Sequence, residues 1–217
     1  MDRIGIETLR ERLVAAGRRL GARRLIAAGE GNLSVRLPGD AILITPSGLR
    51  KDELTPTDLV IVSPDSTWAA RPDGLRPSSD LALHRAVYAA RPDVVAYAHA
   101  HLPSAMALTL AGDFPDPAQL PETALFVPRL PVVPLLTPGS PELAVALAAA
   151  FTAPPQPFPG AALMDRHGAV AVGTWIAGSS DTAAALQLAV DRLELVDVLC
   201  RVWRDAALLR AASQRAR

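Results

Sequence analysis

The sequence predicts a single domain of the α/β class. Stretches in which apolar residues recur every three or four positions, typical of helices, alternate along the chain with short apolar runs typical of strands. The 217 residues, half of them hydrophobic, are enough for one substantial core. The Pro-rich connection at 154–159 is followed by too little chain to form an independent core. We therefore expect one domain over residues 1–217.

The first third of the chain predicts one helix and three strands. Apolar residues recur over 6–20 with spacings of three and four, which indicates an amphipathic helix. Residues 32–37 alternate polar and apolar side chains, as a half-buried strand does, and 41–44 form a second apolar run. The Pro-Gly-Asp turn between these two runs predicts a hairpin. A third strand is expected at 59–63.

The middle of the chain predicts a helix, a buried strand and another helix. Pro77-Ser78-Ser79-Asp80 is typical of a helix start, with hydroxyl caps and an acid in the first turn. His84 lies one turn after Asp80, and we interpret it as a residue of the helix surface or of a site's surroundings rather than as a ligand. The apolar run 94–98 follows a turn and predicts a buried strand, and 103–111 predicts a helix.

The last part of the chain predicts two further helices and three strands. We expect an irregular Pro-rich segment at 113–121, a short strand at 131–136 and a helix from 140 onward. Two strands at 161–164 and 169–172 and a final helix at 186–203 follow. Ser140 and Pro141 suit the cap and the first position of their helix. Cys200 lies on the apolar stripe of the final helix, so we interpret it as a core residue rather than a nucleophile.

Composition narrows the classes of function. The formal net charge is zero and no basic run is present, so the sequence lacks the footprint of a nucleic-acid-binding protein. No apolar run reaches the length of a transmembrane helix, and the charged N-terminus does not resemble a signal peptide. The single cysteine cannot form an intramolecular disulfide. We expect a cytoplasmic protein with neither nucleic acid nor membrane as a partner.

The histidines predict a metal site. His99 and His101 follow the buried strand at positions i and i+2, so both side chains project from the same face of its end. A third imidazole from His167 and a carboxylate from Asp80 would complete a nitrogen-and-oxygen set that suits zinc and related divalent ions. Manganese, cobalt or iron would fit similar ligands. The alternative is that these are ordinary polar residues at a strand end.

Two segments of small residues are candidates for binding a phosphate group. Residues 45–48, Thr-Pro-Ser-Gly, offer hydroxyls and free backbone N–H groups, and the helix start at Ser78 and Ser79 favours anions. Each segment could equally be a simple turn or cap. Lys51, the only lysine, follows the first of them, and the sequence shows no apolar pocket there that would lower its pKa. A lysine-based covalent mechanism is therefore not expected.

Five motifs in this order resemble the class II aldolase and adducin head-domain family. They are Gly31 to Arg36, Ile44 to Gly48, Pro77 to Asp80 with Leu83-His84, His99-Ala100-His101, and His167-Gly168. The resemblance implies a three-layer α/β/α sandwich with a largely antiparallel central sheet, and a homotetramer with active sites at subunit interfaces.

The resemblance also implies roles for individual residues. His99, His101 and His167 would be metal ligands, and Asp80 an acidic ligand or a catalytic base. The substrate phosphate would be held by residues of the small-residue segments: Gly31, Asn32, Ser47, Gly48, Ser78 and Ser79.

The match to the family is incomplete at the positions whose residues act on the far end of the substrate. Aldolases of this family mostly carry Glu where Asp80 stands, whereas the pentose-phosphate epimerases carry Asp. Both use tyrosines late in the chain, but the only tyrosines here, Tyr88 and Tyr97, do not match those positions. Glu122 lies near a region where relatives place a catalytic residue, and we consider it a candidate for the missing acid. The alternative for Glu122 is a surface charge in a loop.

The expected metal site, phosphate site and family together predict an enzymatic function. We expect a metal-dependent aldolase, a carbon–carbon lyase, that cleaves a small sugar phosphate to dihydroxyacetone phosphate and an aldehyde. The alternatives within the family are a sugar-phosphate 4-epimerase, a dehydratase or a decarboxylase. A non-catalytic, adducin-like assembly module is an alternative of a different class, and the three histidines count against it.

Overall fold

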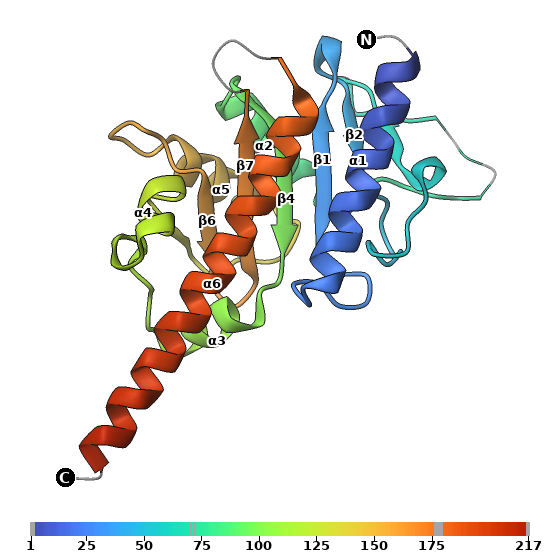
Figure 1. The fold of residues 1–217 in the computed structure, drawn as a ribbon. Helices are drawn as coiled ribbons and strands as arrows, with labels where there is room; N and C mark the ends of the chain where they lie inside the picture. The colour runs from blue at the N-terminus through green and yellow to red at the C-terminus, as the bar shows by residue number, and fades with distance from the viewer. Residues whose placement is uncertain (1–2, 70, 72, 176–179, 216–217) are drawn as a thin grey trace.

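A seven-stranded sheet forms the centre of the molecule (Figure 1). The computed structural model describes residues 3–69, 71, 73–175 and 180–215. Its strands are β1 Asn32–Arg36, β2 Ile42–Ile44, β3 Val60–Val62, β4 Val94–Ala100, β5 Val132–Val133, β6 Ala161–Met164 and β7 Gly168–Thr174. Their order across the sheet is β3-β2-β1-β4-β7-β6-β5, so β4 lies in the middle.

The sheet is mixed, which corrects the expectation of a largely antiparallel sheet. The strand pairs from β3 across to β6 are antiparallel, as in the predicted β1–β2 hairpin, but β5 pairs with β6 in parallel. The cause is the connection between β5 and β6, which contains the helix α5, Pro141–Thr152. A crossover of this kind returns the chain in its starting direction, and two strands joined by it run parallel.

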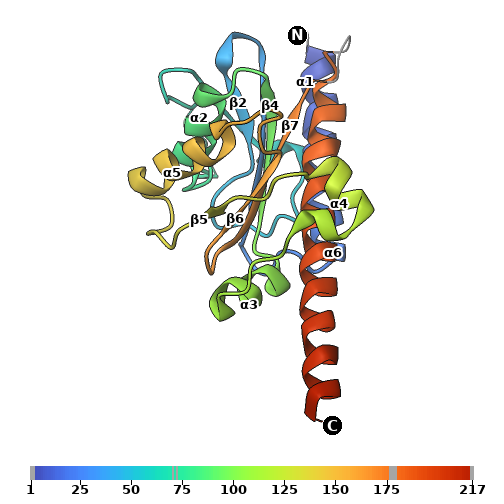
Figure 2. The same cartoon turned by 90° about the vertical axis from the view of Figure 1, so that its left-hand side faces the viewer.

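Helices cover both faces of the sheet. Besides α5, they are α1 Arg3–Ala22, α2 Leu81–Ala90, α3 Pro103–Ala111, α4 Pro121–Phe126 and α6 Thr182–Arg215. Figure 2 shows α2 and α5 on one side of the sheet and α1 and α6 on the other, with α4 beside α6. Short 3-10 helices lie at 38–40, 56–58 and 117–119. Within the described residues, none of the helices combines the length and the apolar character needed to cross a bilayer.

Two hydrophobic cores lie on opposite faces of the sheet. Leu13 of α1, Leu33 of β1 and Leu193 of α6 belong to one core. Val87 of α2 and Leu147 of α5 belong to the other. Every residue of β4 is buried, since this strand contributes side chains to both cores. The predicted buried strand is therefore present, and it extends as far as Ala100.

Several elements differ from the sequence-based expectations. β1 was expected to be half-buried, but Asn32 to Val35 are all buried because α2 covers the polar face of the strand. The short helix α4 was not predicted, since it begins at the end of a Pro-rich segment that we expected to be irregular. The final helix extends to Arg215, well past its apolar stripe. The predicted cap of α5 is confirmed, because the Ser140 hydroxyl accepts from the backbone N–H of Leu143.

A glycine allows a close approach of the sheet to α6. A Cβ added at Gly173 in β7 would lie 1.7 Å from the backbone oxygen of Ala185. We expect Gly173→Ala to lower the free energy of unfolding by about 3 kcal/mol, because the strand and the helix would have to separate. Urea denaturation measures this change.

The control variant is Gly29→Ala, where the nearest atoms would be 3.7 Å from the new Cβ, an ordinary contact. It should change stability by less than about 1 kcal/mol. Equal stabilities of the two variants would contradict the close approach of β7 and α6.

Candidate metal centre

The structure brings together the three histidines that the sequence singled out. His99 lies in β4, His101 directly follows that strand, and His167 lies in the turn between β6 and β7. Their ring centroids are 5.0–5.2 Å apart. One possible ligand atom from each residue lies within 4.8 Å of the others. Such an arrangement can hold a divalent ion through three nitrogens.

His99 has the features of a ligand. Its side chain is buried, and its Nδ1 donates to the backbone oxygen of Ala169 at 3.0 Å. Because Nδ1 carries the hydrogen, Nε2 has a bare lone pair, and this atom is buried without a hydrogen-bond partner among the described residues. Burial, reinforced by His167 and His101, holds the pKa of His99 well below its usual value. A neutral imidazole with a buried, unpaired lone pair fits a metal ion.

His101 and His167 complete the group. Nδ1 of His101 lies 3.3 Å from a carboxylate oxygen of Glu30. A carboxylate on the ring nitrogen that faces away from a metal orients the imidazole. Burial, followed by the proximity of His101, lowers the pKa of His167. Sequence reasoning missed Glu30, because a single acid between two glycines carries no signal of its own.

Two glycines allow the backbone to pass close to the histidines. Gly168 has a φ of +105°, and a Cβ there would lie 2.3 Å from the backbone oxygen of Ala100. Gly31 has a φ of +70°, and its Cβ would lie 2.7 Å from the backbone oxygen of His99. Both positions therefore need a residue without a side chain, independently of any ligand.

Asp80 borders the group without joining it. It is the cap residue of α2, but its side chain makes no capping hydrogen bond. Instead, its Oδ2 accepts from Nδ2 of Asn32 at 2.8 Å. Asn32 pairs with His99 in the sheet, so the Asp80–Asn32 pair lies at the edge of the histidine group. Asp80 stands outside the set of atoms that converge within 4.8 Å.

The two small-residue segments lie side by side. The backbone N–H of Ser47 donates to the oxygen of Arg76, and that of Ser78 donates to the oxygen of Thr45. These two donors were expected to be free for an anion, but the structure uses them to join the segments. The Ser78 hydroxyl is buried and accepts from the N–H of Asp80 at 3.3 Å. Ser47, Gly48 and Ser79 are exposed.

Glu122 is not brought together with the other candidates within this chain. It is exposed in the first turn of α4. Figure 2 shows α4 beside α6, on the opposite side of the sheet from α2, the helix that Asp80 caps.

The expectation that nothing around Lys51 would lower its pKa is wrong. Its side chain is only 2% exposed, and burial lowers its pKa to about 8. Nζ donates to the backbone oxygens of Gly29 and Leu49 at 2.8 and 2.6 Å, which joins two loops. Helix α1 passes close to the Lys51 backbone, since a Cβ added at Gly17 would lie 2.1 Å from the backbone oxygen of Lys51. A helix so distant in the sequence gave no sign of this contact.

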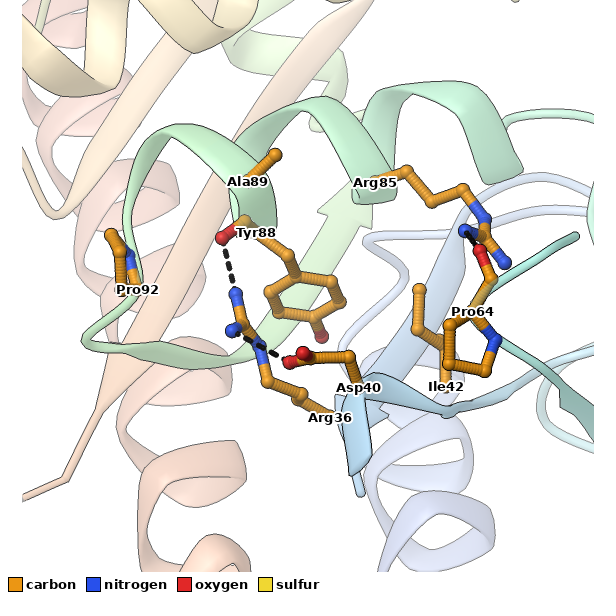
Figure 3. A pocket seen from close by; sticks show the side chains of 8 residues that line it. All are labelled: Arg36, Asp40, Ile42, Pro64, Arg85, Tyr88, Ala89 and Pro92. Atoms are coloured by element: carbon orange, nitrogen blue, oxygen red, sulfur yellow. Dashed lines mark hydrogen bonds and ion pairs between the residues drawn. The ribbon is translucent and has the colours of Figure 1, made fainter. Parts of the chain in front are cut away.

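A cavity of about 500 Å³ lies at the other end of β1 from Asn32. Figure 3 shows Arg36, Asp40, Arg85 and Tyr88 among its lining residues. None of the three converging histidines lines it, so it is separate from the candidate metal centre.

Comparison with known proteins identifies the family. The family model of the Class II Aldolase and Adducin N-terminal domain matches residues 11–203. The chain therefore belongs to this family, which confirms the resemblance indicated by the sequence motifs.

Individual relatives carry different activities. The chain is 34% identical over 197 residues to 5-methylthioribulose-1-phosphate/5-deoxyribulose-1-phosphate aldolase of Rhodospirillum rubrum, covering 90% of this chain and 80% of that protein. It is 38% identical over 153 residues to methylthioribulose-1-phosphate dehydratase of Acidiphilium cryptum, covering 66% and 71%. The crystal structure of L-fuculose-1-phosphate aldolase from Thermus thermophilus has a TM-score of 0.79 at 29% identity, covering 97% of this chain and 98% of that one.

Replacing His99 tests the metal centre. His99→Ala should weaken zinc affinity by more than about 100-fold, because it removes a ligand nitrogen and not merely an orienting partner, whose loss alone typically costs 10–100-fold. Elemental analysis after dialysis and competition with a chromogenic chelator measure the effect. Glu142→Gln, at an exposed position of α5, is the control and should bind zinc like the unaltered protein. Unchanged zinc binding by His99→Ala would remove this residue from the metal centre.

Proposed function

We propose that the chain is a divalent-metal-dependent lyase that cleaves a small ketose 1-phosphate to dihydroxyacetone phosphate and an aldehyde. The observation that carries this proposal is the buried Nε2 of His99, which has no hydrogen-bond partner in the described part of the chain, within the group of three histidines. The aldolase of Rhodospirillum rubrum, at 34% identity, supports the reaction type and suggests a pentulose 1-phosphate as the substrate class.

The three histidines would hold the ion, with Asp80 as a fourth ligand or as a base. Zinc suits three imidazole nitrogens best, and manganese, cobalt or iron(II) are the alternatives. The bound ion would supply Lewis-acid polarisation of the substrate carbonyl.

Proton transfers would fall to carboxylates of the chain. In a retro-aldol cleavage the β-hydroxyl loses its proton, the bond between the α and β carbons breaks, and its electron pair moves toward the carbonyl. A proton then returns to the α carbon. Asp80, oriented by the Asn32 amide, is our candidate for the transfer at the carbonyl end. Glu122 is our candidate for the far end, and it would act from a neighbouring subunit of a homotetramer.

The small-residue segments would hold the phosphate. Ser47, Gly48 and Ser79 are exposed, and they belong to two segments whose backbones are hydrogen-bonded to each other. Gly31, Asn32 and Ser78 would form the inner wall. Holding a group that does not react fixes the orientation of the groups that do.

Dehydration is the second candidate reaction. The dehydratase of Acidiphilium cryptum is 38% identical to the matched part of this chain, and this relative supports removal of water as the alternative to bond cleavage. The two reactions give different products from one substrate. Cleavage yields dihydroxyacetone phosphate, whereas dehydration yields a diketone phosphate with the same number of carbons.

An assay on a panel of ketose 1-phosphates tests the proposal. With zinc bound, we expect release of dihydroxyacetone phosphate, loss of the reaction after chelation, and recovery when zinc is returned. Coupled reduction of dihydroxyacetone phosphate and mass spectrometry measure the products. A diketone phosphate would favour the dehydratase, and an isomeric ketose phosphate the epimerase. A metal-bound protein that leaves the panel unchanged would favour the decarboxylase, because these substrates carry no carboxylate. A protein without metal and without turnover would favour the non-catalytic assembly module.

Replacing Ser79 tests the phosphate site. Ser79→Ala should raise the KM for a phosphorylated ketose by about 10-fold, the equivalent of one hydrogen bond to a charged group. The KM for the unphosphorylated sugar should stay within about twofold. Ser213→Ala, at an exposed position of α6, is the control. Equal changes of KM for both substrates would remove Ser79 from the phosphate site.

A further inference from the structure

A chain of buried hydrogen bonds leads from Asp80 across the interface between α2 and β1. Asp80 Oδ2 accepts from Asn32 Nδ2 at 2.8 Å, and Asn32 Oδ1 lies 2.7 Å from His84 Nε2. His84 Nδ1 lies 2.7 Å from Ser34 Oγ, which lies 2.8 Å from the Tyr88 hydroxyl. Asn32, Ser34, His84 and Tyr88 are all buried. His84, expected at the helix surface or near a site, is thus at the centre of a polar network.

The acceptor chemistry of the Asp80 carboxylate sets the directions of the hydrogen bonds between Asp80 and Ser34. An ionised carboxylate only accepts, so the Asn32 amide nitrogen faces Asp80 and the amide oxygen faces His84. His84 must therefore donate through Nε2. Because burial keeps the ring neutral, its Nδ1 then accepts from the Ser34 hydroxyl. The Tyr88 hydroxyl remains as a donor to Ser34, either to Oγ or to the backbone oxygen, which lies 3.1 Å away.

His84 is held as a neutral ring. It is fully buried, and burial lowers its pKa to about 3. Its ring packs against Tyr97, with the centroids 3.8 Å apart. A neutral, immobile imidazole between two fixed partners does not relay a charge. Its Nε2–H faces the oxygen of the Asn32 amide.

The far end of the network is anchored to the β1–β2 hairpin. Arg36 donates to the backbone oxygen of Tyr88, and its guanidinium lies 5.1 Å from the centroid of the Tyr88 ring. Figure 3 shows Arg36 between Tyr88 and Asp40. Arg36 forms an ion pair with Asp40 at 3.2 Å. The helix that carries His84 is therefore fixed to the strand that carries Asn32.

We propose that His84 is a positioning residue that keeps the Asn32 amide turned so that its N–H points at the Asp80 carboxylate. Without the donor at His84 Nε2, the amide can rotate and present its oxygen to Asp80, which repels the carboxylate and displaces it. This inference rests on the proposed function in one respect only, the role of Asp80 as a metal ligand or a base. The hydrogen-bond directions follow from the contact geometry together with the donor and acceptor chemistry of the groups, and they do not depend on the proposed reaction.

NMR of the zinc-loaded protein tests the directions without any assay of turnover. With ¹⁵N-labelled histidine, His84 should carry its hydrogen on Nε2 and show a bare Nδ1, unchanged between pH 5 and 9. A hydrogen on Nδ1, or a ring that becomes charged in this range, would overturn the proposal. Because this measurement uses the unaltered protein, it stands even if no substrate is found.

Two variants test the effect on Asp80. His84→Gln keeps a side-chain N–H near the place of Nε2, whereas His84→Leu removes it. We expect His84→Leu to lower kcat by about 10-fold or more, with full zinc content and KM within about threefold, as for loss of an orienting partner. His84→Gln should recover kcat to within about threefold. Equal losses in both variants, or loss of zinc in His84→Leu, would assign His84 a packing role instead.

Discussion

The antiparallel pairing of β4 with β1 on one side and β7 on the other is the constraint on which the site depends. The register sets His99 opposite Asn32 in β1 and opposite Val170 in β7. One strand thus presents an imidazole next to the Asp80–Asn32 pair, while the turn that leads into β7 brings His167 to the same place. A slip of one residue would turn His99 to the other face of the sheet and separate all of these groups.

The face of the sheet under α2 combines a hydrophobic core with a line of polar groups. Val87 and Tyr97 belong to the core on this face, yet Asn32, Ser34 and His84 are buried beside them. Burying polar side chains is costly unless each of them finds a partner, and Asn32, Ser34 and His84 all do. The fold can therefore hold the amide of Asn32 in one orientation more firmly than a solvated loop could.

The sequence predicted what depends on local pattern and could not predict what depends on distant contacts. The period of two along a strand was enough to pair His99 with His101, and the cap of α5 followed from two residues. The burial of β1 on its polar face could not be predicted, because the groups that satisfy it come from α2. The same holds for Glu30 beside His101 and for Lys51 beneath α1. The mixed sheet depends on where a two-residue strand pairs, which no periodicity encodes.

The burial of Lys51 has a consequence for the chemistry of the molecular surface. Lys51 is the only lysine, and every other basic side chain apart from the histidines is a guanidinium. Because its Nζ is enclosed between Gly29 and Leu49, the folded surface offers no side-chain amine to acylating or aldehyde reagents. Acylation of Lys51 would therefore require the two loops that it joins to open, and its rate would report on that opening. The same enclosure keeps this side chain from serving as an attachment point for labels or surfaces while the protein stays folded.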